Sequence, residues 1–163
     1  MANRFSKMVA KVYALPSFLH SYLLTKAFCS QVKYANTTGV KILSIKPKRV
    51  ELLLRNKKKV QNHIGGIHAT AAATLAESTS GIVFGMSVPD DKLPLLKSMQ
   101  LSYVRRMQGD LNAVATLNED QIKLIQSEEK GDCFVNVQIT DESGEQPIEC
   151  QMEWAWITKR KNS

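Results

Sequence analysis

The sequence has few cysteines and lacks the spacing of a metal site. Among 163 residues only Cys29, Cys133 and Cys150 are cysteines, an odd number without a CxxC pair. The three histidines do not stand at ligand spacings from them. A disulfide framework and a zinc site are therefore not indicated, and we expect a protein of the reducing cytoplasm that holds no metal and no cofactor of its own.

Long hydrophobic runs are also missing. No stretch approaches the ~20 apolar residues of a membrane-spanning helix. The segment 15–24 is interrupted by Pro16, Ser17, His20 and Ser21, and it lacks a small-residue cleavage site. We therefore expect neither a membrane span nor a secretory signal. An acid-free N-terminus with lysines is also typical of organelle transit peptides, but its regular apolar spacing favours packed helix.

Acidic residues are nearly absent from the first third of the chain. Residues 1–59 contain thirteen Lys or Arg and one acid, Glu51, whereas residues 60–163 contain nine Lys or Arg and fourteen acids. The two segments thus carry +12 and −5 within a total of +7. Such a basic segment is compatible with nucleic acid, a membrane surface or a phosphorylated small molecule, and equally with a solvated face that binds nothing.

The pattern of apolar residues predicts an α+β fold. Helical spacing over residues 4–28, broken at Pro16, predicts two N-terminal helices, and residues 31–39 have the polar character of a turn. Asn118 predicts the N-cap of a short helix. β-branched and alternating segments predict six strands, the third with one buried face formed by Met99, Leu101 and Tyr103. The expected strands are residues 40–45, 50–54, 98–103, 111–117, 133–139 and 148–156.

Bulky side chains are scarce in the segment that the rest of the chain surrounds. The adjacent glycines Gly65 and Gly66 predict a turn, and an alanine-rich helix follows from Ala69 to about Met86. A helix with so few large side chains allows other elements to approach its backbone closely. Strands joined by hairpins then predict a curved antiparallel sheet wrapped around this helix. Its one charge, Glu77, is an acid among small uncharged residues, which indicates a function.

These residues resemble a known family. Asn62, Gly65, His68 and Glu77, with the acid fifteen residues after the asparagine, are similar to the loop–helix motif of hotdog-fold thioesterases, in particular the phenylacetyl-CoA thioesterase-like branch and a bacterial group of unassigned function within it. The resemblance implies one hotdog domain over 1–163, with its core at 40–158 and a helical extension at 1–30. Related enzymes have Gly-Gly where this chain has Ala69-Thr70, and often Asp in place of Glu77.

The residues suggest how a thioester would be hydrolysed. Backbone N–H groups near Ala69 would polarise the carbonyl, and Glu77 would activate water or attack directly. Asn62 would orient that water or hold the turn, and His68 would act in catalysis or cap the helix. Ala69 and Glu77 lie ~12 Å apart on one helix, at about 1.5 Å per residue. One carbonyl cannot contact both, so we expect a homodimer, or a tetramer, with composite sites.

The leaving group would be coenzyme A, as part of the substrate, or the phosphopantetheine of an acyl carrier. Gly65 and Gly66 would face the substrate. An apolar slot for the acyl chain would draw on Phe84, Met86, Met99 and Tyr103, for which core packing is the alternative. Cationic candidates to meet the phosphates are Arg55, Lys57, Lys58, Lys59, Arg105 and Arg106, although the lysine triplet is also compatible with a solvated loop.

Three other functions compete with an acyl-CoA thioesterase. The first is a hotdog protein that binds acyl thioesters without turnover. The second is a hotdog dehydratase, which pairs a loop His with a helix Glu fourteen residues later, as in His63 and Glu77, but after a proline-rich approach that residues 64–67 lack. The third is a basic nucleic-acid module, for which charge is the only support, since no aromatics are interleaved with the lysines. We expect no nucleic-acid partner.

Overall fold

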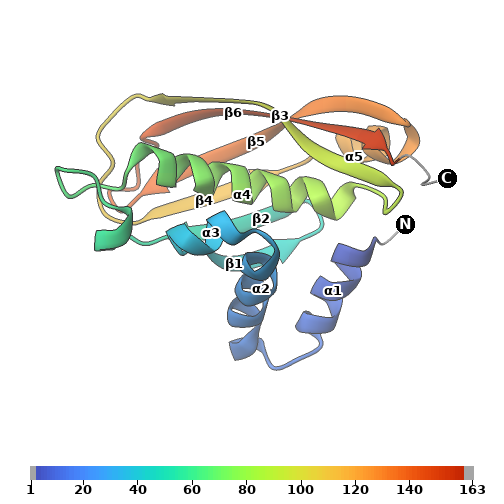
Figure 1. Ribbon diagram of the computed structural model, residues 1–163, viewed down its shortest axis with the longest axis horizontal. Helices are drawn as coiled ribbons and strands as arrows, with labels where there is room; N and C mark the ends of the chain where they lie inside the picture. The colour runs from blue at the N-terminus through green and yellow to red at the C-terminus, as the bar shows by residue number, and fades with distance from the viewer. Residues whose placement is uncertain (1–2, 160–163) are drawn as a thin grey trace.

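A computed structural model describes residues 3–159 of the chain. One long helix, α4, lies at its centre, and a six-stranded antiparallel sheet curves around it (Figure 1). The strand order is β1-β2-β4-β5-β6-β3. This is the α+β hotdog architecture expected from the sequence. The strands are β1 (Lys41–Lys46), β2 (Arg49–Leu54), β3 (Lys92–Tyr103), β4 (Leu111–Thr116), β5 (Lys130–Asp141) and β6 (Ile148–Thr158).

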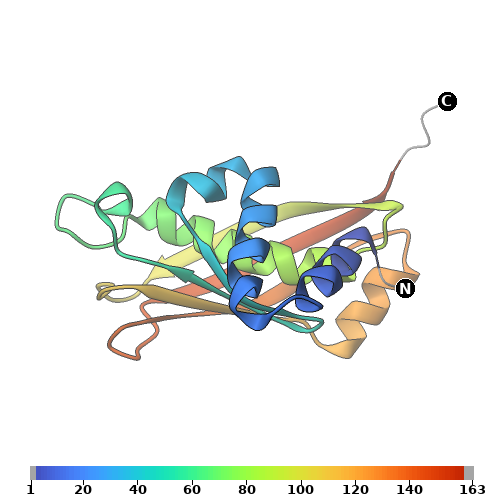
Figure 2. The same cartoon turned by 90° about the horizontal axis from the view of Figure 1, so that it is seen from below.

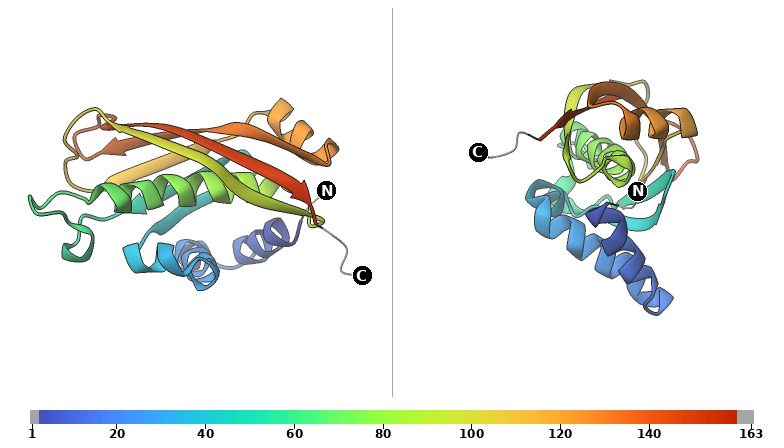
Figure 3. Two further views of the ribbon diagram at one scale, coloured as in Figure 1. Left: turned by 45° about the horizontal axis from the view of Figure 1, so that its top comes forward. Right: turned by 90° about the vertical axis from the view of Figure 1, so that its right-hand side faces the viewer.

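The helices lie on both sides of this arrangement. Figure 2, which views the molecule from below, shows α1, α2 and α3 next to β1, and the end-on view in Figure 3 places them away from β3 and β6. Within the described residues, no helix combines the length and apolar character needed to cross a bilayer. The helices are α1 (Arg4–Tyr13), α2 (Ser17–Gln31), α3 (Lys33–Thr38), the 3-10 turn η1 (Lys58–Val60), α4 (Ala69–Ser87) and α5 (Glu119–Ser127).

The small side chains of α4 let the sheet pack directly against its backbone. A Cβ atom at Gly81 would lie 2.9 Å from the indole of Trp154 on β6. Buried hydroxyl groups on the helix are satisfied locally, as Thr79 Oγ1 donates to the Leu75 carbonyl at 2.6 Å. Ser80 Oγ also accepts from Trp154 Nε1 at 3.0 Å. The helix therefore keeps its polar groups paired without leaving the core.

Asn3 connects the N-terminal helices to the far end of α4. Its Oδ1 accepts from the Ser6 amide at 2.8 Å and so caps α1. Its Nδ2 donates to the carbonyls of Gly85 and Val88 at 2.7 and 2.6 Å, where α4 ends. A single buried side chain thus satisfies the start of one helix and the end of another.

The two N-terminal helices break at Pro16 as expected, but the prediction of a turn over residues 31–39 is wrong. Residues 33–38 form helix α3, which ends at Gly39 with φ of 78°. Ala35 is fully buried and anchors this helix on the core. The helix is only six residues long and mostly polar, so its sequence has no periodic apolar pattern that would predict a helix.

The prediction of a buried face on the third strand is also wrong for the single chain. β3 is longer than expected and lies at the edge of the sheet, paired only with β6. Leu101 packs against the core, but Met99 and Tyr103 are 41% and 43% exposed. A bulge between Leu96 and Ser98 shifts the alternation partway along the strand. The unpaired edge, which sequence alternation cannot reveal, explains the exposure.

A buried lysine joins β3 to α5. Lys92 is 6% exposed, and its Nζ donates to the carbonyls of Ile125, Gln126 and Glu128 at 2.8, 3.0 and 2.7 Å. These carbonyls lie at the C-terminal end of α5, where a cation also complements the helix dipole. The other end of α5 carries the expected N-cap, Asn118, in a capping box.

Candidate active site

The loop before α4 is held by the side chain of Asn62. Its Oδ1 accepts from the backbone amides of Ile64 and Gly66, each at 3.1 Å, and the backbone amide of Asn62 donates to the Gly66 carbonyl at 2.8 Å. Gly65 takes the positive φ of 78° that this turn requires. The Asn62 carbonyl oxygen is therefore committed to the loop, and its Nδ2 is the atom left to orient a substrate or water.

His68 is the N-cap of α4. Its Nδ1 accepts from the Thr70 amide at 3.2 Å and lies 2.9 Å from Thr70 Oγ1. In this bond Nδ1 is the acceptor and carries no proton. The structure thus shows a capping role for this exposed histidine.

Ala69 is the first residue of α4, and its peptide groups differ in their partners. Its carbonyl accepts from the Tyr103 hydroxyl at 2.6 Å, which ties the helix start to the end of β3. Among the described residues its amide has no acceptor, as is usual in a first helical turn. Burial, and secondarily the nearby Cys150, raise the pKa of Tyr103, so this hydroxyl remains a donor. The sequence had suggested only an apolar or core role for Tyr103.

Glu77 lies two turns further along α4, partly buried. With Ala73 it forms the partly exposed stripe of the helix that the sheet does not fully cover. Its carboxylate has no hydrogen bond or ion pair among residues 3–159. Since α4 is continuous from Ala69 to Ser87, one chain does not bring the Ala69 amide and the Glu77 carboxylate together.

Gly65, Gly66 and Arg106 line one pocket of about 380 Å³. Asn56 also lines it, donating from Nδ2 to the Gly65 carbonyl at 3.1 Å, while its buried Oδ1 has no hydrogen-bond partner within residues 3–159. Sequence reasoning missed Asn56, because only its contact with the distant glycine loop brings it here. Arg105 is elsewhere, in an ion pair with Glu145 at 3.0 Å.

Asp141 fixes the loop that carries Arg106. Its carboxylate accepts from the Gln108 amide at 2.9 Å and from the Ser143 amide at 2.9 Å and hydroxyl at 2.5 Å. Burial by itself would raise the pKa of Asp141, but the hydrogen bonds from Ser143, Gln108 and Glu145 outweigh it and lower the pKa below its ordinary value. The ionised form of Asp141 therefore supports the pocket.

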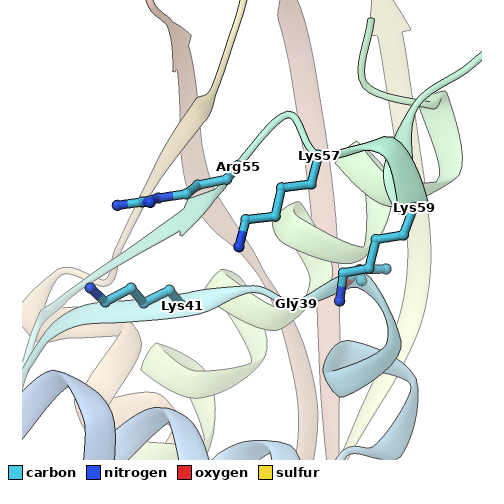
Figure 4. Close-up of a pocket in the computed structure, with 6 residues that line it drawn as sticks. Gly39, Lys41, Arg55, Lys57 and Lys59 are labelled. Carbon is cyan, nitrogen blue, oxygen red and sulfur yellow. The ribbon is translucent and has the colours of Figure 1, made fainter. Parts of the chain in front are cut away.

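Arg55 lies apart from the glycine loop, in a separate pocket of about 260 Å³ with Lys41, Lys57 and Lys59 (Figure 4). Of the lysine triplet, Lys58 does not line this pocket. The structure therefore separates the predicted phosphate contacts into three places, with Arg55, Arg105 and Arg106 each in different surroundings.

Cys133 and Cys150 are unsuited to act as nucleophiles, and the described residues form no metal site. Burial raises the pKa of Cys150 to about 11, and burial together with Asp132 does the same for Cys133. Both thiols are therefore protonated at neutral pH and are poor nucleophiles. Among residues 3–159, no three His, Cys, Asp or Glu side chains are grouped to hold a metal ion.

Comparison with solved structures agrees with this architecture. A Pseudomonas aeruginosa protein of unknown function, described as a probable thioesterase, is 26% identical with a TM-score of 0.77, over 89% of this chain and 97% of that one. A Haemophilus influenzae thioesterase is 15% identical, with a TM-score of 0.69, over 85% and 91% of the two chains. A thioesterase-family protein from Silicibacter pomeroyi is 13% identical, with a TM-score of 0.64, over 83% and 96%.

Sequence comparison adds the family. No curated protein showed significant similarity to the chain. The model of the family described as Domain of unknown function (DUF4442) matches residues 21–157, which is most of the chain. The solved structures at 15% and 13% identity show the fold alone, and the 26% identical protein, described as a probable thioesterase, agrees with a thioesterase-like function in general terms. The protein therefore belongs to the DUF4442 family, with the hotdog fold of thioesterase-like proteins.

Proposed function

We propose that the protein hydrolyses acyl thioesters, with coenzyme A or a carrier as the leaving group, at sites shared between two copies of the chain. The observation that carries this proposal is the carboxylate of Glu77. It is partly buried, has no partner among the described residues, and lies on the stripe of α4 that the sheet leaves uncovered. Partial burial of an unpaired carboxylate lowers the stability of the fold, and such carboxylates are frequent at functional sites.

The edge of the sheet supports a second copy as the partner. β3 has a free edge, and it exposes apolar side chains on both faces, among them Leu93 and Leu95 at 41% and 42%. A long, apolar free edge is a ready template for pairing with another strand. Two β3 strands related by a two-fold axis would extend the sheet and set the uncovered stripes of two α4 helices side by side. The small side chain of Ala73 permits that approach.

In the proposed reaction, the thioester carbonyl accepts a hydrogen bond from the Ala69 amide of one copy. The positive end of the helix dipole stabilises the oxyanion as water adds to the carbonyl carbon. The Glu77 carboxylate of the other copy accepts a proton from that water. Collapse of the tetrahedral intermediate breaks the carbon–sulfur bond, and the proton passes to the departing thiolate. The Asn62 Nδ2 is placed in the adjoining loop to orient the carbonyl or the water.

Complementation between two inactive variants tests the shared site. Ala69→Pro removes one amide N–H at the first helical position, where proline is well tolerated. The preceding residue, His68, already has φ of −66° and ψ of 140°, which a following proline accepts. Glu77→Gln removes the base without changing its size. Each variant alone should release little free thiol from an acyl-CoA.

Mixing the two variants should restore activity. After subunit exchange, half of the dimers are hybrids, and each hybrid has one intact site, so about a quarter of the wild-type activity is expected. Exchange is verified by labelling the two variants with different fluorophores. Absence of activity in confirmed hybrids would eliminate the shared site. Binding of acyl-CoA by wild-type protein without thiol release would indicate a non-catalytic binder instead.

A further inference from the structure

Four cationic side chains line the pocket that contains Arg55. Lys41 is the first residue of β1, Arg55 directly follows β2, and the two strands are paired with Lys41 opposite Leu53. Lys57 and Lys59 descend toward β1 and Gly39 from the loop after β2 (Figure 4). The pocket between these side chains has a volume of about 260 Å³.

None of the four cations has an acidic partner among residues 3–159. Other basic residues of the chain do, as Lys48 pairs with Glu119 and Lys97 with Asp132 and Glu153. Four like charges at one pocket repel one another, and an anion of several charges relieves that repulsion. The mixture of one arginine with three lysines suits phosphate, since guanidinium binds two of its oxygens at once and ammonium groups supply point charges.

The cationic pocket adjoins another pocket at the start of α4. A second pocket, of about 200 Å³, shares Thr38 and Lys59 with the cationic one and is also lined by His68, Thr70 and Ala71. A ligand that occupied both pockets would extend from the first turn of α4 to the four cations within one chain. It would need a reactive group at one end, a slender arm, and a polyanion at the other end.

We propose that this pocket binds the phosphates at the nucleotide end of coenzyme A. This inference rests on the proposed function, which identifies the reactive group as a thioester. The diphosphate and the 3′-phosphate of that end together carry about four negative charges, which matches the four cations. The pantetheine arm would pass through the second pocket, so that its thioester reaches the Ala69 amide. A carrier protein would offer a single phosphodiester, which leaves most of this charge unmatched.

Calorimetric binding of three ligands tests the proposal: coenzyme A, dephospho-coenzyme A and pantetheine. The test variant is Lys41→Ala/Arg55→Ala. The control, Lys123→Ala/Lys130→Ala, removes the same charge from exposed positions on α5 and β5. At ~0.1 M salt the test variant should bind coenzyme A about 4- to 25-fold more weakly, since each of the two exposed contacts accounts for roughly 2- to 5-fold. The loss should be smaller for dephospho-coenzyme A and absent for pantetheine.

The outcomes separate this proposal from the proposed hydrolysis. Equal weakening of coenzyme A binding by test and control variants, or wild-type binding of pantetheine as tight as that of coenzyme A, would overturn the phosphate site. So would turnover of an acyl carrier by a protein that does not bind coenzyme A. Wild type and test variant should hydrolyse an acyl-pantetheine equally, because this substrate lacks the phosphates that the pocket would bind. Equal rates would show that the substitutions leave the reaction itself intact. Pocket-dependent binding without any thiol release would uphold the phosphate site and reject the hydrolase.

Discussion

Replacing Gly81 by alanine tests how closely the sheet packs on α4. The added Cβ would lie 2.9 Å from two atoms of the Trp154 indole, closer than carbon atoms approach without displacement. The indole is not free to move, because its Nε1 donates to Ser80 Oγ at 3.0 Å and its ring stacks on Phe84 with centroids 5.6 Å apart. The substitution therefore forces a shift of the helix or of β6.

Gly85→Ala provides a matched control four residues further along the helix. There the added Cβ would meet Phe5 at 3.7 Å, an ordinary van der Waals distance. Both substitutions gain up to about 1 kcal/mol of helix propensity. Overpacking costs about 1–3 kcal/mol, and only Gly81→Ala incurs it. Gly85→Ala should therefore stabilise the protein by about 0.5–1 kcal/mol, and Gly81→Ala should destabilise it by up to about 2 kcal/mol.

Urea unfolding and thermal melts of both variants, at one protomer concentration, measure this difference. A gap of about 1–3 kcal/mol corresponds to roughly 3–10 °C in Tm for a chain of this size. If Gly81→Ala is as stable as Gly85→Ala, the indole yields without cost, and the close packing of sheet on helix does not explain the small side chains of α4.

Three further predictions concern polar contacts. Lys92→Met should lower the unfolding free energy by about 2–4 kcal/mol, because three carbonyls at the end of α5 lose their buried donor. The control, Lys123→Met at an exposed position, should change it by less than about 0.5 kcal/mol. Equal effects of the two variants in urea unfolding would contradict this reasoning. Tyr103→Phe should cost about 0.5–1.5 kcal/mol and speed amide exchange in the first turn of α4, and unchanged exchange would show that the bond to the Ala69 carbonyl does not hold that turn. Because the pKa of Asp141 is lower in the folded chain than its ordinary value of 3.8, its stabilisation is fully present above about pH 4 and is lost as the pH falls below that value through the folded pKa. Asp141→Asn should therefore flatten this part of the pH profile of unfolding, and a profile as steep as that of wild type would assign the acid loss to other groups.

Local signals in the sequence predicted much of the fold. Pro16 marked the break between α1 and α2, Asn118 marked the start of α5, and the glycine turn before Ala69 marked the start of α4. Each of these residues acts on the backbone next to it in the sequence, so its effect does not depend on the tertiary structure. Helix α3 was missed because what holds it is the burial of Ala35 against distant elements.

The candidate site was less accessible to sequence reasoning. Spacing along one helix was enough to show that the Ala69 amide and Glu77 cannot meet in one chain. The convergence of Lys41 with Arg55 was not visible, because it depends on the register between β1 and β2. In the same way, nothing near Tyr103 in the sequence indicates that its hydroxyl reaches the Ala69 carbonyl, since β3 returns to the helix start only after the sheet has formed.

The side chain of Asn3 has a practical consequence for work on this protein. It lies at the very beginning of the described chain, yet it ends α4 by donating to the carbonyls of Gly85 and Val88. Removal of the first three residues would therefore leave both carbonyls without this donor, at the end of the central helix that lies farthest from the glycine loop.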